Sequence, residues 1–396
     1  MNHLTEKIER IQEVLKSAGI PGWLFYDFRG SDPIAYRILS LDTHGHFTRR
    51  WFYLIPAHGA PRKLVHRIES HNLDPLPGET TQYTAWEELQ ENLKEMLEGL
   101  GSVAMQYSPG NAIPYVSLVD AGTVEFIRSL GLKLESSADL IQLFECVWND
   151  EEIADHRVAA ARITQIVREA FEFTAARIVE LGKSNEFEVQ SFIMGRFDDE
   201  GLETDFPPIV AVNEHSGDPH YAPTQDSFSE IRKGDFLLID LWARVEDKDS
   251  VFADITWTAF FGDAVPERVK EAFKVISAAR DTGVEFIRNK LAQGRGPLGY
   301  EVDDAVRAVI QKEGLGQFLL HRTGHNLART IHGNGVNFDN FETHDTRRVI
   351  PGITCTIEPG VYQSDFGLRS EINIYMSATG VEVTTPPQEA VLLFEC

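Results

Sequence analysis

The fold is decided by residues 234–258, which read GDFLLIDLWARVEDKDSVFADITWT. Phe236 to Ile239 form an apolar strand that ends at Asp240, and a second apolar strand carries Asp254. A short polar connection separates them, so we expect the two strands to pair as the arms of a hairpin. A carboxylate in such a setting is costly unless it is paired, hydrogen-bonded or bound to a metal. Taken singly, each Asp could cap a turn or receive a structural hydrogen bond.

A histidine-rich segment follows farther along the chain. Residues 321–335 read HRTGHNLARTIHGNG and hold His321, His325 and His332. The interspersed glycines let the backbone approach a ligand closely. A lone histidine is more often a satisfied core or loop residue, but three within twelve residues favour a functional cluster.

Two glutamates complete the pattern. Glu358 directly follows the apolar strand of PGITCTIEPGVYQ, and Glu371 lies inside the apolar run of GLRSEINIYM. Either could be the salt-bridge partner of a nearby arginine such as Arg369. Together with the two aspartates, however, these carboxylates would repel one another strongly without cations. Four carboxylates and the imidazole of His325 suit a pair of divalent metals that share bridging oxygens.

The chain of 396 residues is long enough for two domains. Alternating strand and helix patterns predict an α/β domain over residues 1–147. Asn149 followed by Glu152 is typical of a capping box at the start of a long helix, and the second domain, residues 148–396, begins there. Long helices mixed with strands that pair as hairpins predict an α+β fold for it.

Composition restricts the classes of partner. Lys and Arg total 37 against 61 Asp and Glu, a formal net charge of −24, which repels nucleic-acid backbones and anionic membranes. No apolar run approaches the ~18 residues of a membrane span, and the N-terminal segment has no apolar core of a secretory signal. The three cysteines are far apart and form neither a disulfide framework nor a CxxC metal site. We therefore expect a cytoplasmic protein that binds neither nucleic acid nor membrane.

The motifs GDFLLIDL, FADITWT, HRTGH, TIEPGVY and GLRSE resemble, in this order, those of the pita-bread metallopeptidases. That family contains aminopeptidase P, prolidase, methionine aminopeptidase and the metal-free creatinase. The first domain is similar to the ribonuclease H-like N-terminal α/β domain of creatinase and prolidase. The resemblance implies a pita-bread catalytic domain, a homodimer, and a peptide substrate with proline at its second position.

The resemblance also implies a dinuclear metal site. Asp240 would bind one metal, and Asp254 and Glu371 would bridge the pair. His325 and Glu358 would complete the coordination of the other metal. Mn²⁺ is the expected ion, with Co²⁺, Zn²⁺ or Fe²⁺ as alternatives, and the oxygen-rich ligand set suits manganese on chemical grounds too.

Other positions resemble catalytic residues of the family. His220 and His332 are similar to histidines that hydrogen-bond the substrate or its tetrahedral intermediate, and His321 to a supporting residue. Arg369 resembles the arginine that orients the bridging carboxylate. The implied reaction is hydrolysis of an Xaa-Pro bond by a metal-bridging hydroxide, with Glu358 passing a proton to the leaving nitrogen.

The sequence departs from the family on the substrate side. Arg322 and Asn326 stand where the family has glycines beside the histidine motif, and the connection between the two aspartates is longer. An extended stretch also covers residues 336–349. A dipeptidase needs a cation for the free carboxylate of its substrate. Arg322, Arg347 and Arg348 are candidates, although a solvated basic face is the simpler interpretation.

Several alternatives stay open at this point. The chain could be an Xaa-Pro aminopeptidase or an Xaa-Pro dipeptidase, a creatinase-like hydrolase of another C–N bond, or a non-catalytic peptide-binding module. In the first domain THGHFTRRW carries His44, His46, Arg49 and Arg50. In a dimer this segment could border the active site of the other subunit, although a plain surface loop is the simpler interpretation.

Overall fold

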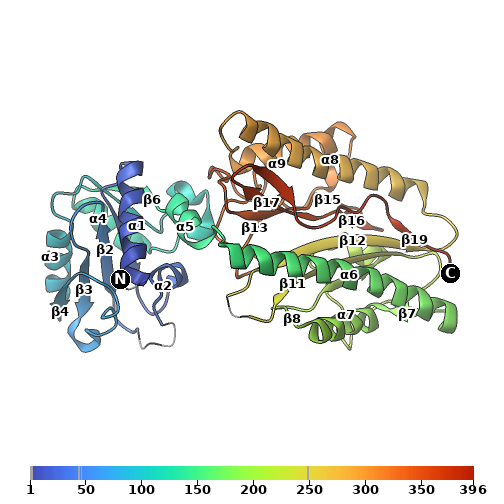
Figure 1. Ribbon diagram of the computed structural model, residues 1–396, viewed down its shortest axis with the longest axis horizontal. Helices are drawn as coiled ribbons and strands as arrows, with labels where there is room; N and C mark the ends of the chain where they lie inside the picture. Colours follow the sequence, from blue (N-terminus) through green and yellow to red (C-terminus); the bar gives the residue numbers. More distant parts are fainter. Residues whose placement is uncertain (1–2, 43–44, 46, 248) are drawn as a thin grey trace. The chain divides into compact units, whose positions relative to one another are not determined.

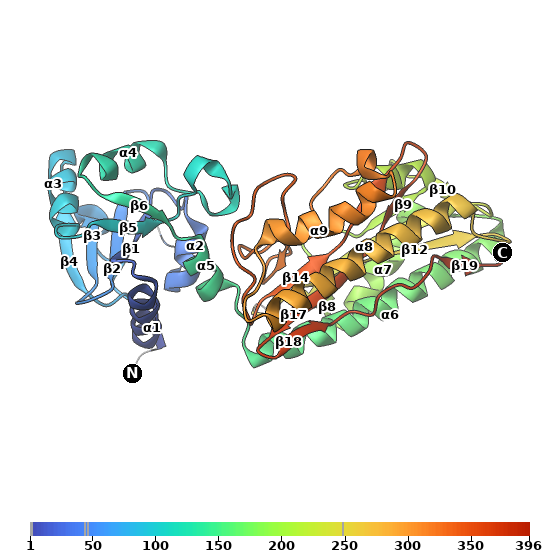
Figure 2. The same cartoon turned by 90° about the horizontal axis from the view of Figure 1, so that it is seen from above.

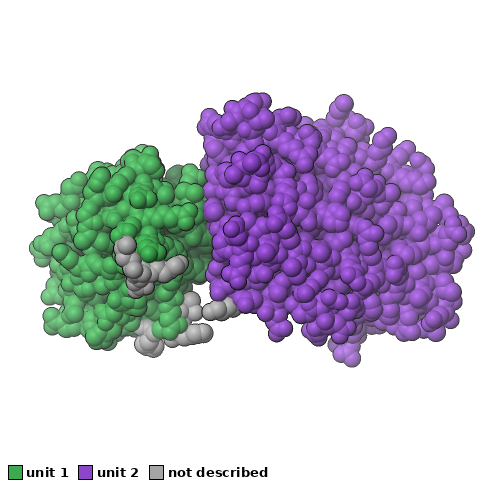
Figure 3. All heavy atoms as spheres, in the orientation of Figure 1, with its two compact units in different colours: residues 1–145 green, residues 146–396 purple. Residues whose placement is uncertain are grey.

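The structure is a computed structural model, and the residues it describes are 3–42, 45, 47–247 and 249–396. The chain divides into two compact units, residues 1–145 and 146–396, so the division falls two residues before the predicted boundary (Figure 3). His44 and His46 of the N-terminal segment lie outside the described residues.

Unit 1 is built around a single sheet. Its described strands lie in the order β4-β3-β2-β1-β5-β6, in which β2 is antiparallel to both neighbours and the other neighbouring pairs are parallel. The strands are β1 (Gly22–Asp27), β2 (Trp51–Pro56), β3 (Arg62–His66), β4 (Glu79–Tyr83), β5 (Ser102–Met105) and β6 (Lys133–Ser136).

Helices cover both faces of this sheet. Alternate residues of a strand point to opposite faces, so Trp23 and Phe25 of β1 pack with α1, α2 and α5. Leu24 and Tyr26 pack on the other face with α3 and α4. Unit 1 therefore has the α/β architecture expected from the sequence. The helices are α1 (His3–Ala18), α2 (Pro33–Leu39), α3 (Trp86–Met96), α4 (Ala121–Ser129) and α5 (Ala138–Glu145).

A long helix opens unit 2. α6 (Asp150–Leu181) begins with the predicted capping box: the Asn149 side chain accepts the Glu151 and Glu152 N–H groups, and Glu152 accepts the Asn149 N–H, each at 2.9 Å. Gly182 ends the helix in a left-handed conformation, with φ of 74°. The other α-helices described in this unit are α7 (Glu186–Glu200), α8 (Glu267–Ala292) and α9 (Gly299–Lys312).

The described strands of unit 2 form several small sheets. The longest pair is the β11–β12 hairpin, which lies in the order β19-β12-β11-β8 with β9 also pairing with β11. A second sheet has the order β13-β14-β17-β18, and β15 pairs with β16. Two short strands, β7 (Ser184–Asn185) and β10 (Glu230–Ile231), pair with each other. The other strands are β8 (Leu202–Glu203), β9 (Ile209–Val212), β11 (Phe236–Val245), β12 (Ala253–Phe261), β13 (Asn326–Leu327), β14 (Thr354–Ile357), β15 (Gly360–Tyr362), β16 (Gly367–Arg369), β17 (Ile372–Ser377), β18 (Gly380–Val383) and β19 (Leu392–Phe394).

Two helix pairs enclose these sheets (Figure 1). Leu237, Ile239 and Leu241 of β11 pack in one apolar cluster with residues of α6 and α7. Phe236 and Leu238 pack on the opposite face with residues of α8 and α9. Figure 2 shows α8 and α9 running alongside each other. Within the described part of the chain, no helix combines the length and the apolar character that a bilayer crossing requires.

Candidate metal centre

The β11–β12 hairpin brings two acidic side chains to one face. The two strands are antiparallel, with Asp240 opposite Thr256 and Trp242 opposite Asp254. Residues directly opposite each other share a face, as do residues two apart, so Asp240, Asp254 and Thr256 point to the same side. The hairpin is therefore confirmed. The expectation that Asp240 ends its strand was wrong, because the ladder continues to Ala243 and β11 extends to Val245.

The second sheet supplies His325 and Glu358. His325 directly precedes β13, and its N–H donates to Thr356 Oγ1 while its C=O accepts the Thr356 N–H, both at 2.9 Å. Glu358 directly follows β14 and accepts the hydroxyl of Thr356 at 3.0 Å. Thr356 thus holds both residues, and His325 Nε2 lies 3.4 Å from Glu358 Oε1.

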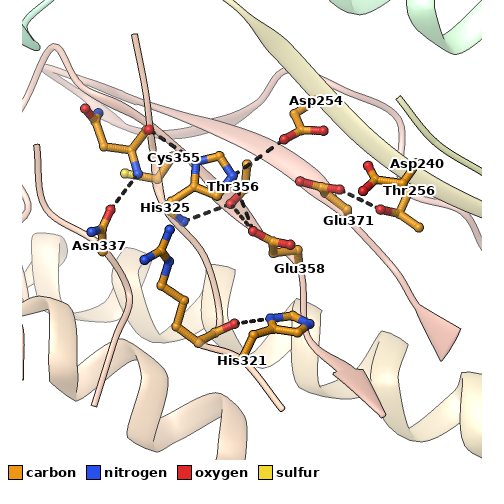
Figure 4. A network of polar contacts seen from close by, with 12 residues as sticks. Asp240, Asp254, Thr256, His321, His325, Asn337, Cys355, Thr356, Glu358 and Glu371 are labelled. Atoms are coloured by element: carbon orange, nitrogen blue, oxygen red, sulfur yellow. Dashed lines mark hydrogen bonds and ion pairs between the residues drawn. The ribbon is translucent and has the colours of Figure 1, made fainter. Parts of the chain in front are cut away.

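Glu371 comes from the turn between β16 and β17. The hydroxyl of Thr256 donates to Glu371 Oε2 at 2.7 Å. The side chain of Asn373 accepts the Asp254 N–H at 2.9 Å and donates to the Asp254 C=O at 2.7 Å. These contacts tie β12 to the start of β17. Figure 4 shows the result: the imidazole of His325 is turned toward the carboxylates of Asp254 and Glu358, and Glu371 lies on the same side of the ring.

Three of these side chains form the tightest group. One ligand atom from each of Asp254, His325 and Glu371 can be chosen so that all lie within 4.8 Å of one another. The three residues are 5%, 4% and 1% exposed. Asp254 Oδ1 and Glu371 Oε1 accept no hydrogen bond from any residue that the structure describes. Buried polar atoms are seldom left unpaired, so a cation between these oxygens fits the residues present.

The pKa shifts of the buried carboxylates also favour a cation at this position. Burial raises the pKa of Asp254 and Glu371 well above the ordinary values, and the carboxylates crowded around them raise it further. Burial also raises the pKa of Glu358 to about 7, although Arg369 opposes the rise. A nearby divalent cation reverses this balance, because it stabilises the ionised form of every carboxylate around it.

Asp240 and Arg369 form a separate contact at the side of this group. Arg369 pairs with Asp240 through Nη2, and donates to Thr256 Oγ1 and to the Tyr362 hydroxyl at 2.8 Å each. Arg369 therefore reaches Glu371 through Thr256 and contacts Asp240 directly. Burial raises the pKa of Asp240, and the charges of Arg369 and His220 oppose the rise.

The other three histidines surround the group at different depths. His321 Nε2 lies 2.6 Å from the Tyr362 hydroxyl, and burial lowers the pKa of His321 to about 3, so the ring is neutral near pH 7. The ring of His332 is exposed and meets the ring of His325 edge-on, with centroids 4.4 Å apart. His220 is also exposed, in the turn after the short helix Asn213–Gly217.

The interpretation of Arg322, Arg347 and Arg348 as a solvated basic face was wrong, and the side chain of Arg322 is only 11% exposed. Arg347 is 2% exposed and binds Asp345 with two nitrogens, at 3.0 and 2.6 Å. Arg348 is half-buried and donates to the carbonyl of Gly296. Buried guanidinium groups are stable only when they are paired, and these two brace the extended stretch from within.

Four residues at the site escaped the sequence analysis: Thr256, Thr356, Tyr362 and Asn373. A signal for three of them was present, because each lies two residues from a candidate ligand: Thr256 from Asp254, Thr356 from Glu358 and Asn373 from Glu371. Residues two apart on a strand share a face. Tyr362 carries no such signal, since only the pairing of β15 with β16 brings it to Arg369.

The sequence of this chain is similar to those of several bacterial peptidases. The probable dipeptidase PepE of Mycobacterium tuberculosis is 24% identical over 354 residues, which are 88% of this chain and 86% of that protein. The putative dipeptidase YkvY of Bacillus subtilis is 25% identical over 272 residues, 66% of this chain and 67% of that protein.

The fold of this chain is similar to those of solved peptidase structures. The dipeptidase PepE of Mycobacterium ulcerans matches with a TM-score of 0.71 at 18% identity, covering 99% of this chain and 98% of its own. The prolidase of Thermococcus sibiricus matches with a TM-score of 0.64 at 20% identity, covering 99% and 100%. These likenesses confirm the predicted pita-bread fold. The predicted family is confirmed as well: residues 155–378, more than half of the chain, match the pattern of metallopeptidase family M24, and the chain belongs to that family.

Proposed function

We propose that the protein hydrolyses Xaa-Pro bonds with the help of two divalent metal ions, most suitably Mn²⁺. The observation that carries this proposal is the buried group of Asp254, His325 and Glu371, whose ligand atoms lie within 4.8 Å of one another and whose two carboxylates each keep one oxygen without a donor among the described residues. Asp240 and Glu358 flank that group and complete a set of five ligands. Four hard carboxylates with one imidazole suit manganese better than a softer metal.

The bound metals would supply a deprotonated water near neutral pH and polarise the scissile carbonyl. Glu358, a carboxylate beside His325 in this set, is suited to accept a proton from that water and to pass it on. His332 and His220, both exposed beside the buried group, are suited to donate hydrogen bonds to the oxygen that becomes negative. Arg369 and Thr256 hold Asp240 and Glu371 in place.

Proline at the second position makes particular demands on such a site. The leaving nitrogen of an Xaa-Pro bond is a tertiary amide without a hydrogen of its own, so the enzyme must supply a proton to it. Glu358 is the residue placed to do so in this proposal. The names of the similar structures are consistent with that substrate class, since they include prolidases and an Xaa-Pro dipeptidase.

The test is a metal assay joined to a hydrolysis panel. The manganese content of the purified protein is measured, and Xaa-Pro dipeptides are compared with longer Xaa-Pro peptides and with matched peptides that lack proline. We expect Xaa-Pro cleavage that a chelator abolishes and manganese restores. A folded, manganese-loaded protein that leaves every Xaa-Pro peptide intact would contradict the substrate class. A Glu358→Gln variant with full activity would contradict the proton-transfer role.

The proposal also includes a cytoplasmic homodimer. Two of the three cysteines, Cys146 and Cys355, are buried, and the cysteines form no disulfide with one another, which suits a reducing compartment. Light scattering of the purified protein tests the dimer, and a monomer at micromolar concentration would contradict it. Cell fractionation tests the compartment, where recovery outside the cytoplasmic fraction would contradict it.

A further inference from the structure

The sheet of unit 1 has a cavity of about 790 Å³ at the edge where β1, β3 and β4 end. Tyr26, His66 and Tyr83 line it from the ends of these three strands. β2 is antiparallel to β1 and β3, so its first residues lie at the same edge, and its Phe52 lines the cavity too. Open α/β sheets bind ligands outside the carboxyl ends of their strands, and the volume is in the range of ligand sites.

Aromatic side chains form much of the apolar lining of this cavity. They are Tyr26, Phe28, Phe52, Tyr83, Trp86 and Phe126. The three that belong to strands are buried, whereas Phe28 after β1 is 42% exposed and Trp86, the first residue of α3, is 61% exposed. A large aromatic side chain that stays open to solvent beside a cavity has area left to bury. This lining therefore favours a ligand with an aromatic ring.

Two neighbouring arginines, Arg49 and Arg50, add positive charge to the lining. Arg49 donates from Nη1 to Thr48 Oγ1 at 2.8 Å, and its N–H donates to Glu69 at 3.0 Å. Arg50 is exposed, and its guanidinium forms no ion pair with a carboxylate of any residue that the structure describes. Its carbonyl accepts the Tyr83 hydroxyl at 2.7 Å, which holds the backbone beside the cavity. In a chain of net charge −24, an arginine without an acidic partner at an aromatic cavity favours a ligand with an anionic group.

The two helices that begin at the cavity, α3 and α4, have their first N–H groups occupied. Asp120 accepts the Thr123 N–H at 2.9 Å and the Thr123 hydroxyl at 2.8 Å. Glu88 accepts the N–H groups of Thr84 at 2.7 Å and of Ala85 at 3.3 Å. A phosphate at a helix N-terminus depends on free N–H groups, and Asp120, which lines the cavity, repels a doubly charged anion. A carboxylate carries one charge and pairs with arginine through two parallel hydrogen bonds, so it fits this lining better.

We propose that this cavity binds a small molecule in which an aromatic ring is joined to a carboxylate. Arg50 binds the carboxylate, and Phe28 and Trp86 cover the ring. All of these residues belong to unit 1, so the inference does not rest on the proposed function. Aromatic acids and aromatic amino acids share this chemistry. They differ by an ammonium group, which the Asp120 carboxylate would attract.

The test is a calorimetric titration of the purified full-length protein with hydrocinnamate, which carries a phenyl ring and a carboxylate. We expect a dissociation constant below about 1 mM. Hydrocinnamamide, which lacks the charge, and propionate, which lacks the ring, should each bind at least about 10-fold more weakly. Phenylalanine in a parallel titration distinguishes the two sources, because tighter binding than that of hydrocinnamate assigns the cavity to amino acids and weaker binding assigns it to acids without an ammonium group.

Two variants locate the binding. Arg50→Gln should raise the dissociation constant of hydrocinnamate by about 10- to 100-fold, the range for a charge-assisted hydrogen-bonded pair, and change that of the amide little. Arg50→Lys should recover part of the loss. Trp86→Ala should weaken the acid and the amide alike, by about 2- to 10-fold. The matched controls are Arg10→Gln, on α1 at the opposite face of the sheet, and Phe206→Ala, whose side chain in unit 2 is 67% exposed.

Circular dichroism shows whether each variant keeps its fold, and both Arg50 and Trp86 are exposed, so we expect no loss. Three results would overturn the inference. One is an unaltered protein that does not bind hydrocinnamate. Another is unchanged affinity in both Arg50→Gln and Trp86→Ala, because the acid would then bind elsewhere, for example at the metal centre. The third is tighter binding of phenyl phosphate than of hydrocinnamate, which would exclude a carboxylate site.

Discussion

Unit 2 holds two buried groups of acidic side chains, and they are stabilised in different ways. One group lies in the wall, by which we mean the extended stretch 336–349 and the part of α9 that contacts it. It consists of Asp303, Asp339 and Asp345, which are fully buried and each accept several hydrogen bonds from N–H or hydroxyl groups. Asp254 and Glu371 at the metal centre are nearly as buried, yet each keeps one oxygen without a donor among the described residues. Burial of acids alone therefore does not favour a metal, whereas buried carboxylates that lie close together and keep unsatisfied oxygens do.

Backbone geometry explains the difference. The stretch 336–349 is an irregular loop whose N–H groups can turn toward a carboxylate, as those of residues 341–343 turn toward Asp339 and that of Asn340 turns toward Asp303. Asp240 lies within a strand whose N–H and C=O groups are used in pairing along the ladder. The Asp254 N–H and C=O are both taken by Asn373. Carboxylates on such a strand receive few backbone donors, so a cation is the remaining source of positive charge.

The largest effect is expected from neutral replacements at the metal centre. Asp254→Asn and Glu371→Gln should lower peptidase activity by about 10³-fold or more, because the metals would be lost and they stabilise the transition state by several kcal/mol. The same changes should raise the free energy of unfolding of the metal-free protein by about 1–3 kcal/mol, since they remove uncompensated buried charge. Activity assays, metal analysis and urea unfolding measure the three quantities. Full metal content in either variant would contradict the ligand assignment.

A replacement in the wall should lower the free energy of unfolding, whereas the replacements at the metal centre should raise it. Asp339→Asn keeps the shape of the side chain but turns an amide NH₂ toward backbone N–H groups, and we expect it to lower the free energy of unfolding by about 2–4 kcal/mol. Manganese content should remain unchanged. Urea unfolding of the metal-free protein gives the comparison with Asp254→Asn directly. If both variants shift stability with the same sign, the distinction between the two acidic groups is lost.

The sequence predicted the acidic group at the metal centre and not the acidic group in the wall, for a physical reason. Patterning identified the strand that carries Asp254, the apolar run that carries Glu371 and the motifs that surround them, and the family resemblance supplied the expected roles, which stay predictions. Nothing local in the sequence shows that Asp303 reaches Thr323, because this contact joins segments that only the tertiary fold brings together. Asp345 and Arg347 lie two residues apart, but nothing in the sequence shows that the pair is buried. Arg347 was consequently expected to be solvated.

Strand ends were harder to place than strands. Asp240 was expected at the end of its strand, since the apolar run stops there. The ladder with β12 nevertheless continues through Trp242 and Ala243, whose partners are themselves buried. Tertiary packing decided this boundary, whereas the capping box at Asn149 and Glu152 is a local signal and was predicted correctly.

The pH dependence of the free energy of unfolding also distinguishes the two acidic groups, by a smaller effect. Burial raises the pKa of Glu358 from 4.5 to about 7 in the absence of metal. The folded state then holds this proton more tightly than the unfolded state does. The free energy of unfolding should therefore fall as pH rises from about 4.5 to about 7, by on the order of 3 kcal/mol. Asp254 and Glu371, whose pKa values are also raised, extend the fall to higher pH.

Manganese should remove this slope, because it keeps the site carboxylates ionised in the folded state. Asp303 in the wall provides the internal reference. Burial raises its pKa to about 6, and its contribution should be the same with and without manganese. Urea unfolding from pH 5 to pH 8, with chelator or with manganese, measures both. Identical pH profiles under the two conditions would show that the metal does not bind between these carboxylates.

The smallest effect is expected near Asp240, a candidate metal ligand that is also paired with a cation of the protein itself. Asp240 has a cation from the protein itself, Arg369, and the Tyr362 hydroxyl orients that arginine while contacting His321. Tyr362→Phe removes one oxygen and leaves every candidate metal ligand in place. We expect kcat to fall by about 10-fold, the lower end for a partner that orients a metal ligand, with manganese content nearly unchanged. The lost hydrogen bonds should lower the free energy of unfolding by about 1–3 kcal/mol. Steady-state kinetics beside metal analysis tests this. A loss of manganese in Tyr362→Phe would instead mean that Arg369 holds Asp240 as a ligand, and Asp240 would then belong with Asp254 and Glu371 among the side chains that need the cation.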